Sequence, residues 1–170
     1  MYEQQNWQPG DLVFMSTKGL IGKGIRWAQR RLPDSVDAQW NHVAILDRFV
    51  DGEWFVIQAQ PKGVTDNLTL TESAFGGTSE VVQLPRTANR DLVLRFARSQ
   101  VGLKYGYLSI LSCAFDLFLP ESVCIRKSRT WICSGLVTMA LLFGGFLSMV
   151  SVDDVYSMTP AEVKFFSTEK

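Results

Sequence analysis

Cys133 has a side chain and a sequence position suited to nucleophilic catalysis. It lies near the start of the most apolar stretch of helical character in the chain, within the segment Trp131 to Val137. A thiol at a helix N-terminus is favoured in its thiolate form by the helix dipole and by unpaired backbone N–H groups. The same N–H groups can stabilise the oxyanion of a tetrahedral intermediate. Taken alone, Cys133 fits a buried packing residue better, because cysteine is among the most buried residue types.

His42 is the single histidine of the chain, so any imidazole chemistry depends on it. It opens a run of strand-forming residues, and we expect its ring at a sheet edge that faces a cleft. A cysteine at a helix start and a histidine at a strand start are the pair that a thiol hydrolase needs, with the histidine as general base. The sequence therefore predicts that Cys133 and His42 meet in the fold.

A third polar group lies on the next predicted strand. Gln58 and Gln60 are two positions apart, so their amides face the same side of a sheet. An amide can hold an imidazole in the tautomer that proton transfer requires. We expect Gln58 to orient His42, with Gln60 as the alternative.

The elements that must position these residues indicate an α+β architecture, and the length favours one domain over residues 1–170. Strands are expected at 12–15, 42–46, 54–59 and 81–84, the last three as an antiparallel meander. Helices are expected at about 20–32, 90–100, 107–119 and 131–143. The Gly-, Ser- and Thr-rich interval 63–79 reads as a loop.

Charge and cysteine content exclude several classes of protein. Seventeen basic and seventeen acidic residues give zero net charge, so no overall field attracts nucleic acid, and no nucleic-acid partner is expected. Segment 18–31 holds five basic and no acidic residues; a solvated face is the favoured interpretation, and a groove for an anionic substrate is the alternative. The spacing of Cys113, Cys124 and Cys133 fits neither a zinc site nor a disulfide framework, so we expect no metal, no cofactor and a free thiol.

The uncharged segment 132–152 is long enough to cross a membrane. Gly144-Gly145 and several Ser and Thr residues interrupt it, which favours a buried helix followed by a second apolar piece. A membrane anchor over 136–150 is the alternative. The first residues carry no export signal, so the chain is expected to be cytoplasmic as synthesised, with export by another route left open.

Several segments resemble motifs of NlpC-type papain-like cysteine hydrolases. The matching segments are Gly10-Asp11-Leu12-Val13-Phe14, His42-Val43-Ala44-Ile45, Val56-Ile57-Gln58-Ala59, Val101-Gly102-Leu103-Lys104-Tyr105-Gly106 and Cys133-Ser134-Gly135-Leu136-Val137. The histidine strand precedes the cysteine segment, which is the order of the circularly permuted branch with its YiiX-like and lecithin:retinol acyltransferase-like proteins. Residues 158–162 resemble the closing segment of that branch.

The resemblance implies a circularly permuted papain-like fold, in which an antiparallel sheet packs against helices and the nucleophile begins a central helix. It implies Cys133 as nucleophile and His42 as base, oriented by Gln58, with Tyr105 and Ser134 contacting the oxyanion or the substrate. The implied reaction is cleavage of an amide or ester bond through a thioacyl-enzyme intermediate.

The substrate implied first is a cell-wall peptide (peptidoglycan) amide. The alternatives are a lipid or N-acyl hydrolase or acyltransferase of the same fold, and a non-catalytic binding module. Two positions depart from the family pattern, since Ile132 stands where unpermuted members often have Asp, and Gln58 stands where permuted members often have Glu. An amide orients an imidazole but does not neutralise an imidazolium.

Overall fold

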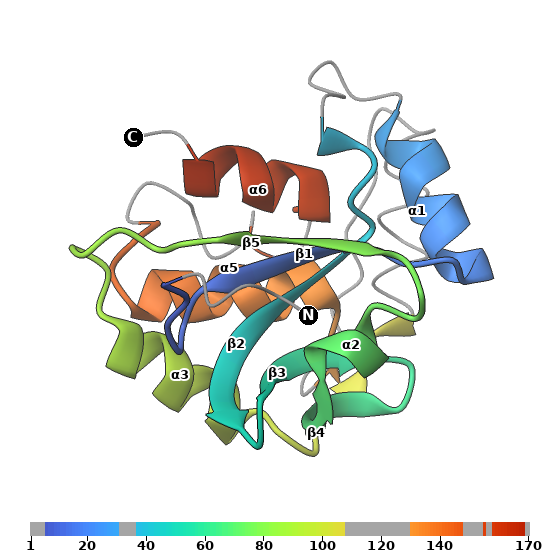
Figure 1. The fold of residues 1–170 in the computed structure, drawn as a ribbon. Coiled ribbons are helices and arrows are strands. Elements are labelled where there is room, and N and C mark those ends of the chain that lie inside the picture. Colours follow the sequence, from blue (N-terminus) through green and yellow to red (C-terminus); the bar gives the residue numbers. More distant parts are fainter. Residues whose placement is uncertain (1–5, 31–36, 108–129, 148–154, 156–157, 169–170) are drawn as a thin grey trace.

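The protein is described here by a computed structural model that covers residues 6–30, 37–107, 130–147, 155 and 158–168. These residues form an α+β structure around a five-stranded antiparallel sheet (Figure 1). The sheet has the order β4-β3-β2-β1-β5. Its strands are β1 (Leu12–Ser16), β2 (His42–Val50), β3 (Glu53–Gln60), β4 (Gly63–Thr69) and β5 (Thr78–Val82).

The hairpin between β2 and β3 follows from two residues. Asp51 and Gly52 both have positive φ, 52° and 85°, which is the backbone of the type I′ turn that matches the twist of paired strands. Strands predicted at 12–15, 42–46 and 54–59 are confirmed, and each is longer than predicted. The start of β2 at His42 is also confirmed.

The interval predicted as a loop contains β4 and the short helix α2 (Leu70–Ser73), so that prediction is wrong. The strand is polar because it lies at the sheet edge, where only one side pairs. Thr69 and Glu72 cap α2 through a reciprocal capping box. The strand predicted at 81–84 overlaps β5 at Val81 and Val82. It pairs with β1 at the opposite edge of the sheet, so its predicted place in the meander is wrong, and the meander is β2-β3-β4.

Four longer helices accompany the sheet: α1 (Leu20–Gln29), α3 (Arg90–Ser99), α5 (Cys133–Phe143) and α6 (Pro160–Thr168). The first is shorter than the predicted 20–32, while α3 and α5 confirm their predictions closely. Helix α6 was not predicted, although Thr159 and Glu162 form a capping box at its start. Nearly all of the helix predicted at 107–119 lies outside the described residues.

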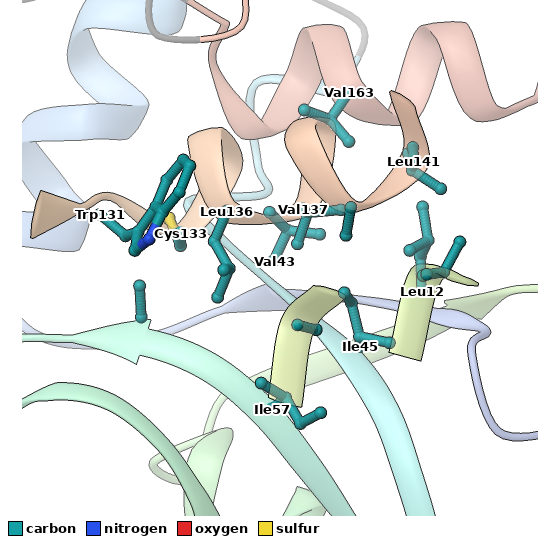
Figure 2. Close-up of a cluster of buried hydrophobic side chains, with 14 of the residues drawn as sticks. Leu12, Val43, Ile45, Ile57, Trp131, Cys133, Leu136, Val137, Leu141 and Val163 are labelled. Carbon is teal, nitrogen blue, oxygen red and sulfur yellow. The ribbon is translucent and has the colours of Figure 1, made fainter. Parts of the chain in front are cut away.

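Helix α5 packs against the sheet face that carries Val43, Ile45 and Ile57, as Figure 2 shows. Eight of the eleven residues of α5 are buried, and each fully buried Leu or Val stabilises the fold by roughly 1.5–3 kcal/mol. Its uncharged sequence therefore reflects a core helix. No helix among the described residues is long and apolar enough to cross a membrane.

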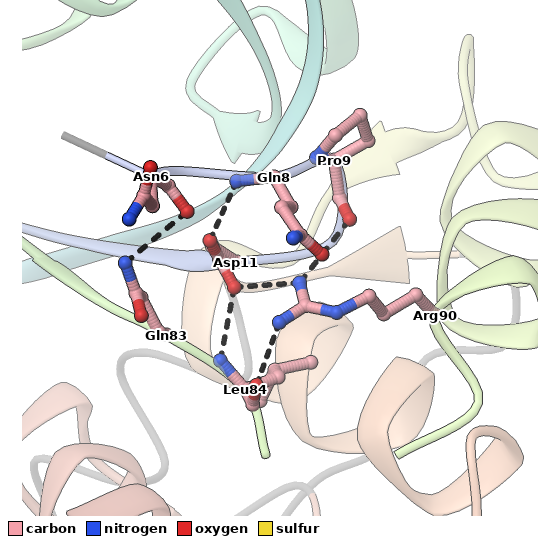
Figure 3. Close-up of polar contacts among 7 residues, drawn as sticks. All are labelled: Asn6, Gln8, Pro9, Asp11, Gln83, Leu84 and Arg90. Atoms are coloured by element: carbon pink, nitrogen blue, oxygen red, sulfur yellow. Dashed lines mark hydrogen bonds and ion pairs between the residues drawn. The ribbon is translucent and has the colours of Figure 1, made fainter. Parts of the chain in front are cut away.

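A buried carboxylate fixes the start of β1. Asp11 is fully buried and accepts hydrogen bonds from Leu84 N at 2.9 Å and Gln8 N at 2.8 Å. Its Oδ1 also forms an ion pair with Arg90 at 2.6 Å, and Arg90 donates to the Leu84 carbonyl at 2.6 Å (Figure 3). The Gly-Asp segment thus joins the N-terminal residues, the end of β5 and the start of α3.

Candidate active site

Cys133, His42 and Gln58 come together where α5, β2 and β3 begin or end. Ile132 is extended, with φ −97° and ψ 162°, and the helix starts directly after it at Cys133. Cys133 is 4% exposed and His42 is half-buried, whereas Gln58 is almost completely buried. The elements place a thiol, an imidazole and an amide in one partly enclosed site.

The imidazole is held by an amide from the neighbouring strand. Nε2 of His42 lies 2.7 Å from Oε1 of Gln58. The amide nitrogen of Gln58 donates to Oγ of Ser73 at 2.7 Å. Since the amide oxygen then faces the ring, Nε2 carries the proton and Nδ1 is the nitrogen available to Cys133.

Gln60 lies close to this site but makes a different contact. Its amide nitrogen donates to Oγ1 of Thr65 at 3.3 Å. Of the two candidate amides, Gln58 contacts His42, whereas Gln60 contacts Thr65.

Cys133 and His42 favour each other's charged forms. Burial lowers the pKa of His42, but the charge of Cys133 and hydrogen bonds to Cys133 and Gln58 outweigh it, so the pKa is raised overall. Burial raises the pKa of Cys133, but the charge of His42, its hydrogen bond and two backbone N–H groups outweigh it, so that pKa is lowered overall. The balance favours a thiolate–imidazolium pair.

The two backbone N–H groups belong to Val43 and Ser134. Pairing between β2 and β3 begins at Ile45 and Ile57, so Val43 stands beyond the paired register. Its N–H is thereby free to face the sulfur of Cys133. The sequence carries no signal for this contact, because it uses a main-chain atom whose direction depends on strand pairing.

Ser134 contributes through its backbone. It is buried, and it is not among the described residues that line the pocket at Cys133. Its carbonyl accepts from Oγ1 of Thr138 at 2.9 Å, one turn along α5. The contact of Ser134 with Cys133 is made by its backbone N–H.

A pocket of about 520 Å³ opens onto Cys133 and His42. Gln58, Gln60 and Tyr105 line it as well. Burial raises the pKa of Tyr105, and the nearby Cys133 and Tyr107 raise it further. The Tyr105 hydroxyl therefore keeps its proton and is a hydrogen-bond donor at the pocket.

Asn41, which sequence reasoning missed, also lines the pocket and is held in place by Thr17. Its side chain accepts from Thr17 N at 2.9 Å and from Thr17 Oγ1 at 3.0 Å, and it donates to the Thr17 carbonyl at 2.9 Å. A Cβ on Gly22 would lie 2.4 Å from Nδ2 of Asn41. The glycine lets α1 pack directly on the residue that precedes His42.

Apart from the Cys133–His42 pair, the described pocket lining contains no acidic or basic side chain. From the basic segment 18–31, Arg26 donates to the Thr17 carbonyl at 2.7 Å and so braces the connection between β1 and α1. Lys18, Lys23 and Arg30 are exposed. These three exposed side chains are not among the described residues that line the pocket.

The described residues around Cys133 do not form a set of metal ligands. No group of three or more His, Cys, Asp or Glu residues within the described parts of the chain lies close enough to hold a metal ion. The described pocket lining includes two such side chains, Cys133 and His42, and Gln58 already holds one ring nitrogen of the histidine.

Comparison with known proteins finds a fold likeness. No family model and no curated protein matches the chain. Among solved structures it is similar to the metalloprotein YiiX from Escherichia coli O157:H7, with 16% sequence identity and a TM-score of 0.54. The match covers 81% of this chain and 66% of that one, slightly less than two thirds of its length. At this identity the likeness concerns the fold.

Proposed function

We propose that this chain is a cysteine hydrolase that acts through a thioacyl-enzyme on Cys133. The observation that carries the proposal is the contact of a helix-start thiol with an imidazole whose far nitrogen is held by Gln58. This is the arrangement that lets a histidine serve a cysteine nucleophile as acid and base. The YiiX-like fold is compatible with the permuted papain-like architecture expected from the sequence.

In the acylation step, the Cys133 thiolate attacks the substrate carbonyl carbon and a C–S bond forms. The carbonyl electrons move to oxygen, where the first N–H groups of α5 and the Tyr105 hydroxyl are the donors at hand. The tetrahedral intermediate collapses, and its bond to the leaving nitrogen or oxygen breaks. His42 gives its proton to that leaving group.

In the deacylation step, His42 takes a proton from water and the resulting hydroxide attacks the thioester carbonyl. The C–S bond breaks, which releases the acid and regenerates the thiolate, and His42 is again protonated. Gln58 keeps the ring in one orientation throughout, because its oxygen accepts from Nε2 in both protonation states.

The walls of the pocket favour an uncharged acyl group. Ile25, Ala59, Pro61 and Phe75 line it, and apart from Cys133 and His42 no described lining residue is acidic or basic. A cell-wall peptide carries carboxylates and ammonium groups, whose desolvation against such apolar walls is costly. Among the substrates implied by the resemblance, an ester or amide of an apolar acyl chain fits better.

The test is acylation of the purified protein by p-nitrophenyl acetate, butanoate and octanoate, followed by intact-protein mass spectrometry. We expect a Cys133-linked acyl adduct that forms fastest with a longer chain. Cys133→Ala is the control and is expected to form none. Parallel incubation with peptidoglycan tests the cell-wall substrate. An adduct that persists in Cys133→Ala, or no adduct with any ester, would contradict the proposal.

A further inference from the structure

Ser73 lies behind the candidate triad and was not singled out by the sequence. It is the last residue of α2 and is fully buried. Its Oγ accepts a 2.7 Å hydrogen bond from Nε2 of Gln58, on the side of the amide opposite His42. A chain of contacts therefore runs from Ser73 through Gln58 and His42 to Cys133.

An amide can turn either its oxygen or its NH₂ group toward a histidine, and only the oxygen suits this site. When His42 is an imidazolium, both ring nitrogens are donors, so the amide must offer its oxygen. A rotated amide would aim N–H donors at a ring N–H donor. Glutamate, common at this position in the family that the chain resembles, has two equivalent oxygens and no such wrong orientation.

We propose that Ser73 is a positioning residue, whose hydroxyl engages the amide nitrogen of Gln58 and thereby keeps the amide oxygen on His42. This inference rests on the proposed thiol hydrolase site. In this role Ser73 selects the amide orientation that places the oxygen toward His42. A carboxylate, with two equivalent oxygens, would need no such partner.

Helix α2 holds Ser73 in a fixed place. Its N-terminus is closed by the Thr69–Glu72 capping box. Leu70 and Ala74 pack against the sheet face opposite α5, in a cluster with Ala44 and Val56. Because both ends of this short helix are anchored, the Ser73 hydroxyl is a stable reference point for the Gln58 side chain.

The first test uses nuclear magnetic resonance, because His42 is the single histidine and its ring nitrogens give unambiguous signals. Ser73→Ala is expected to lower the pKa of His42, since the Gln58 hydrogen bond that raises it becomes less populated. Ser73→Thr keeps the hydroxyl and is expected to retain the wild-type ring signals. Wild-type signals in Ser73→Ala, or signals in Ser73→Thr that match those of Gln58→Ala, would overturn the proposal.

The second test is a double-mutant cycle read by the rate of Cys133 alkylation with iodoacetamide at mildly acidic pH. Ser73→Ala is expected to slow alkylation about fivefold, the effect of losing one net hydrogen bond. In the Gln58→Ala background the same substitution is expected to have no further effect. Equal slowing in both backgrounds would show that Ser73 does not act through Gln58.

Alkylation and ring signals do not require a substrate. If the acyl-ester experiment fails while Ser73→Ala still changes both readouts through Gln58, the hydrolase assignment fails and the positioning role stands. If ester acylation occurs and Ser73→Ala changes neither readout, the positioning role fails alone.

Discussion

The Nε2 atom of His42 lies 2.7 Å from Oε1 of Gln58, and this contact decides which ring nitrogen serves Cys133. With Nε2 engaged, Nδ1 is the ring nitrogen left available to the thiol. A neutral acceptor fixes the ring without adding a full negative charge. The thiolate of Cys133 is then the main partner for the positive charge of His42.

The alkylation of Cys133 by iodoacetamide is expected to persist at a pH where ordinary thiols are unreactive. The lowered pKa keeps the thiolate populated as the pH falls, so the half-maximal rate occurs below the pH found for a free cysteine peptide. The rate constant measured across a pH series, with the labelled residue located by peptide mass spectrometry, checks this.

His42→Ala is the informative variant for the same profile. Without the imidazolium, burial acts against the thiolate with only backbone N–H groups to oppose it, so the pKa of Cys133 is expected to rise. The half-maximal rate should then move to higher pH. A profile unchanged by His42→Ala would contradict the thiolate–imidazolium pair.

Ester hydrolysis is expected to follow a bell-shaped pH profile. The acid limb reflects the lowered pKa of Cys133, because activity requires the thiolate. The basic limb reflects the raised pKa of His42, because the leaving group takes its proton from the imidazolium. Gln58→Glu adds a carboxylate beside the ring and is expected to move the basic limb to higher pH, whereas Gln58→Ala should move it lower.

Much of the candidate site was predictable from local sequence. The apolar helical pattern over 131–143 placed Cys133 near a helix start, and the apolar run after His42 placed that residue at a strand start. Asp51-Gly52 predicted the hairpin that brings β3, and with it Gln58, beside β2. Each of these signals depends on neighbours in the chain.

Ser73 and the N–H of Val43 were not predictable in the same way. Ser73 meets Gln58 only because β4 pairs with β3 and α2 returns over the sheet, and the polar residues of β4 read as a loop. The Val43 N–H faces Cys133 only because β2 and β3 stop pairing at Ile45. Long-range register sets both contacts, and no local pattern encodes register.

Asp11→Ala is expected to lower the free energy of unfolding by about 3 kcal/mol, the lower end of the range for breaking a buried ion pair. The substitution removes the carboxylate partner of Arg90 and the acceptor of two backbone N–H groups. Urea unfolding followed by circular dichroism measures the change. Because Asp11 lies at the end of β1 away from His42, alkylation of Cys133 in the folded variant should keep its wild-type rate.

Asp66→Ala is the matched control for that loss. Asp66 faces Arg48 at 3.8 Å, and both side chains are about 40% exposed, at 39% and 41%. An exposed pair of this kind contributes roughly 0–1 kcal/mol. Equal destabilisation by the two substitutions would contradict the role given to the buried Asp11 network.

Gly22→Ala and Gly24→Ala form a matched pair within α1 that tests how the pocket wall is positioned. A Cβ at Gly22 would lie 2.4 Å from Nδ2 of Asn41 and 2.8 Å from Oγ1 of Thr17, whereas a Cβ at Gly24 meets no atom within 4 Å. Both changes raise helix propensity by about 1 kcal/mol. Gly24→Ala is therefore expected to raise the melting temperature, while Gly22→Ala must push α1 away from Asn41 and lower it.

The two variants should also differ in reactivity, because Asn41 immediately precedes His42. Gly22→Ala is expected to reduce the rate of Cys133 acylation by p-nitrophenyl octanoate, since displacement of Asn41 and Thr17 alters a wall of the pocket. Gly24→Ala should leave that rate unchanged, because Gly24 is exposed and does not line the pocket. Equal acylation rates in the two variants, together with equal melting temperatures, would show that the close approach of α1 to Asn41 does not shape the site.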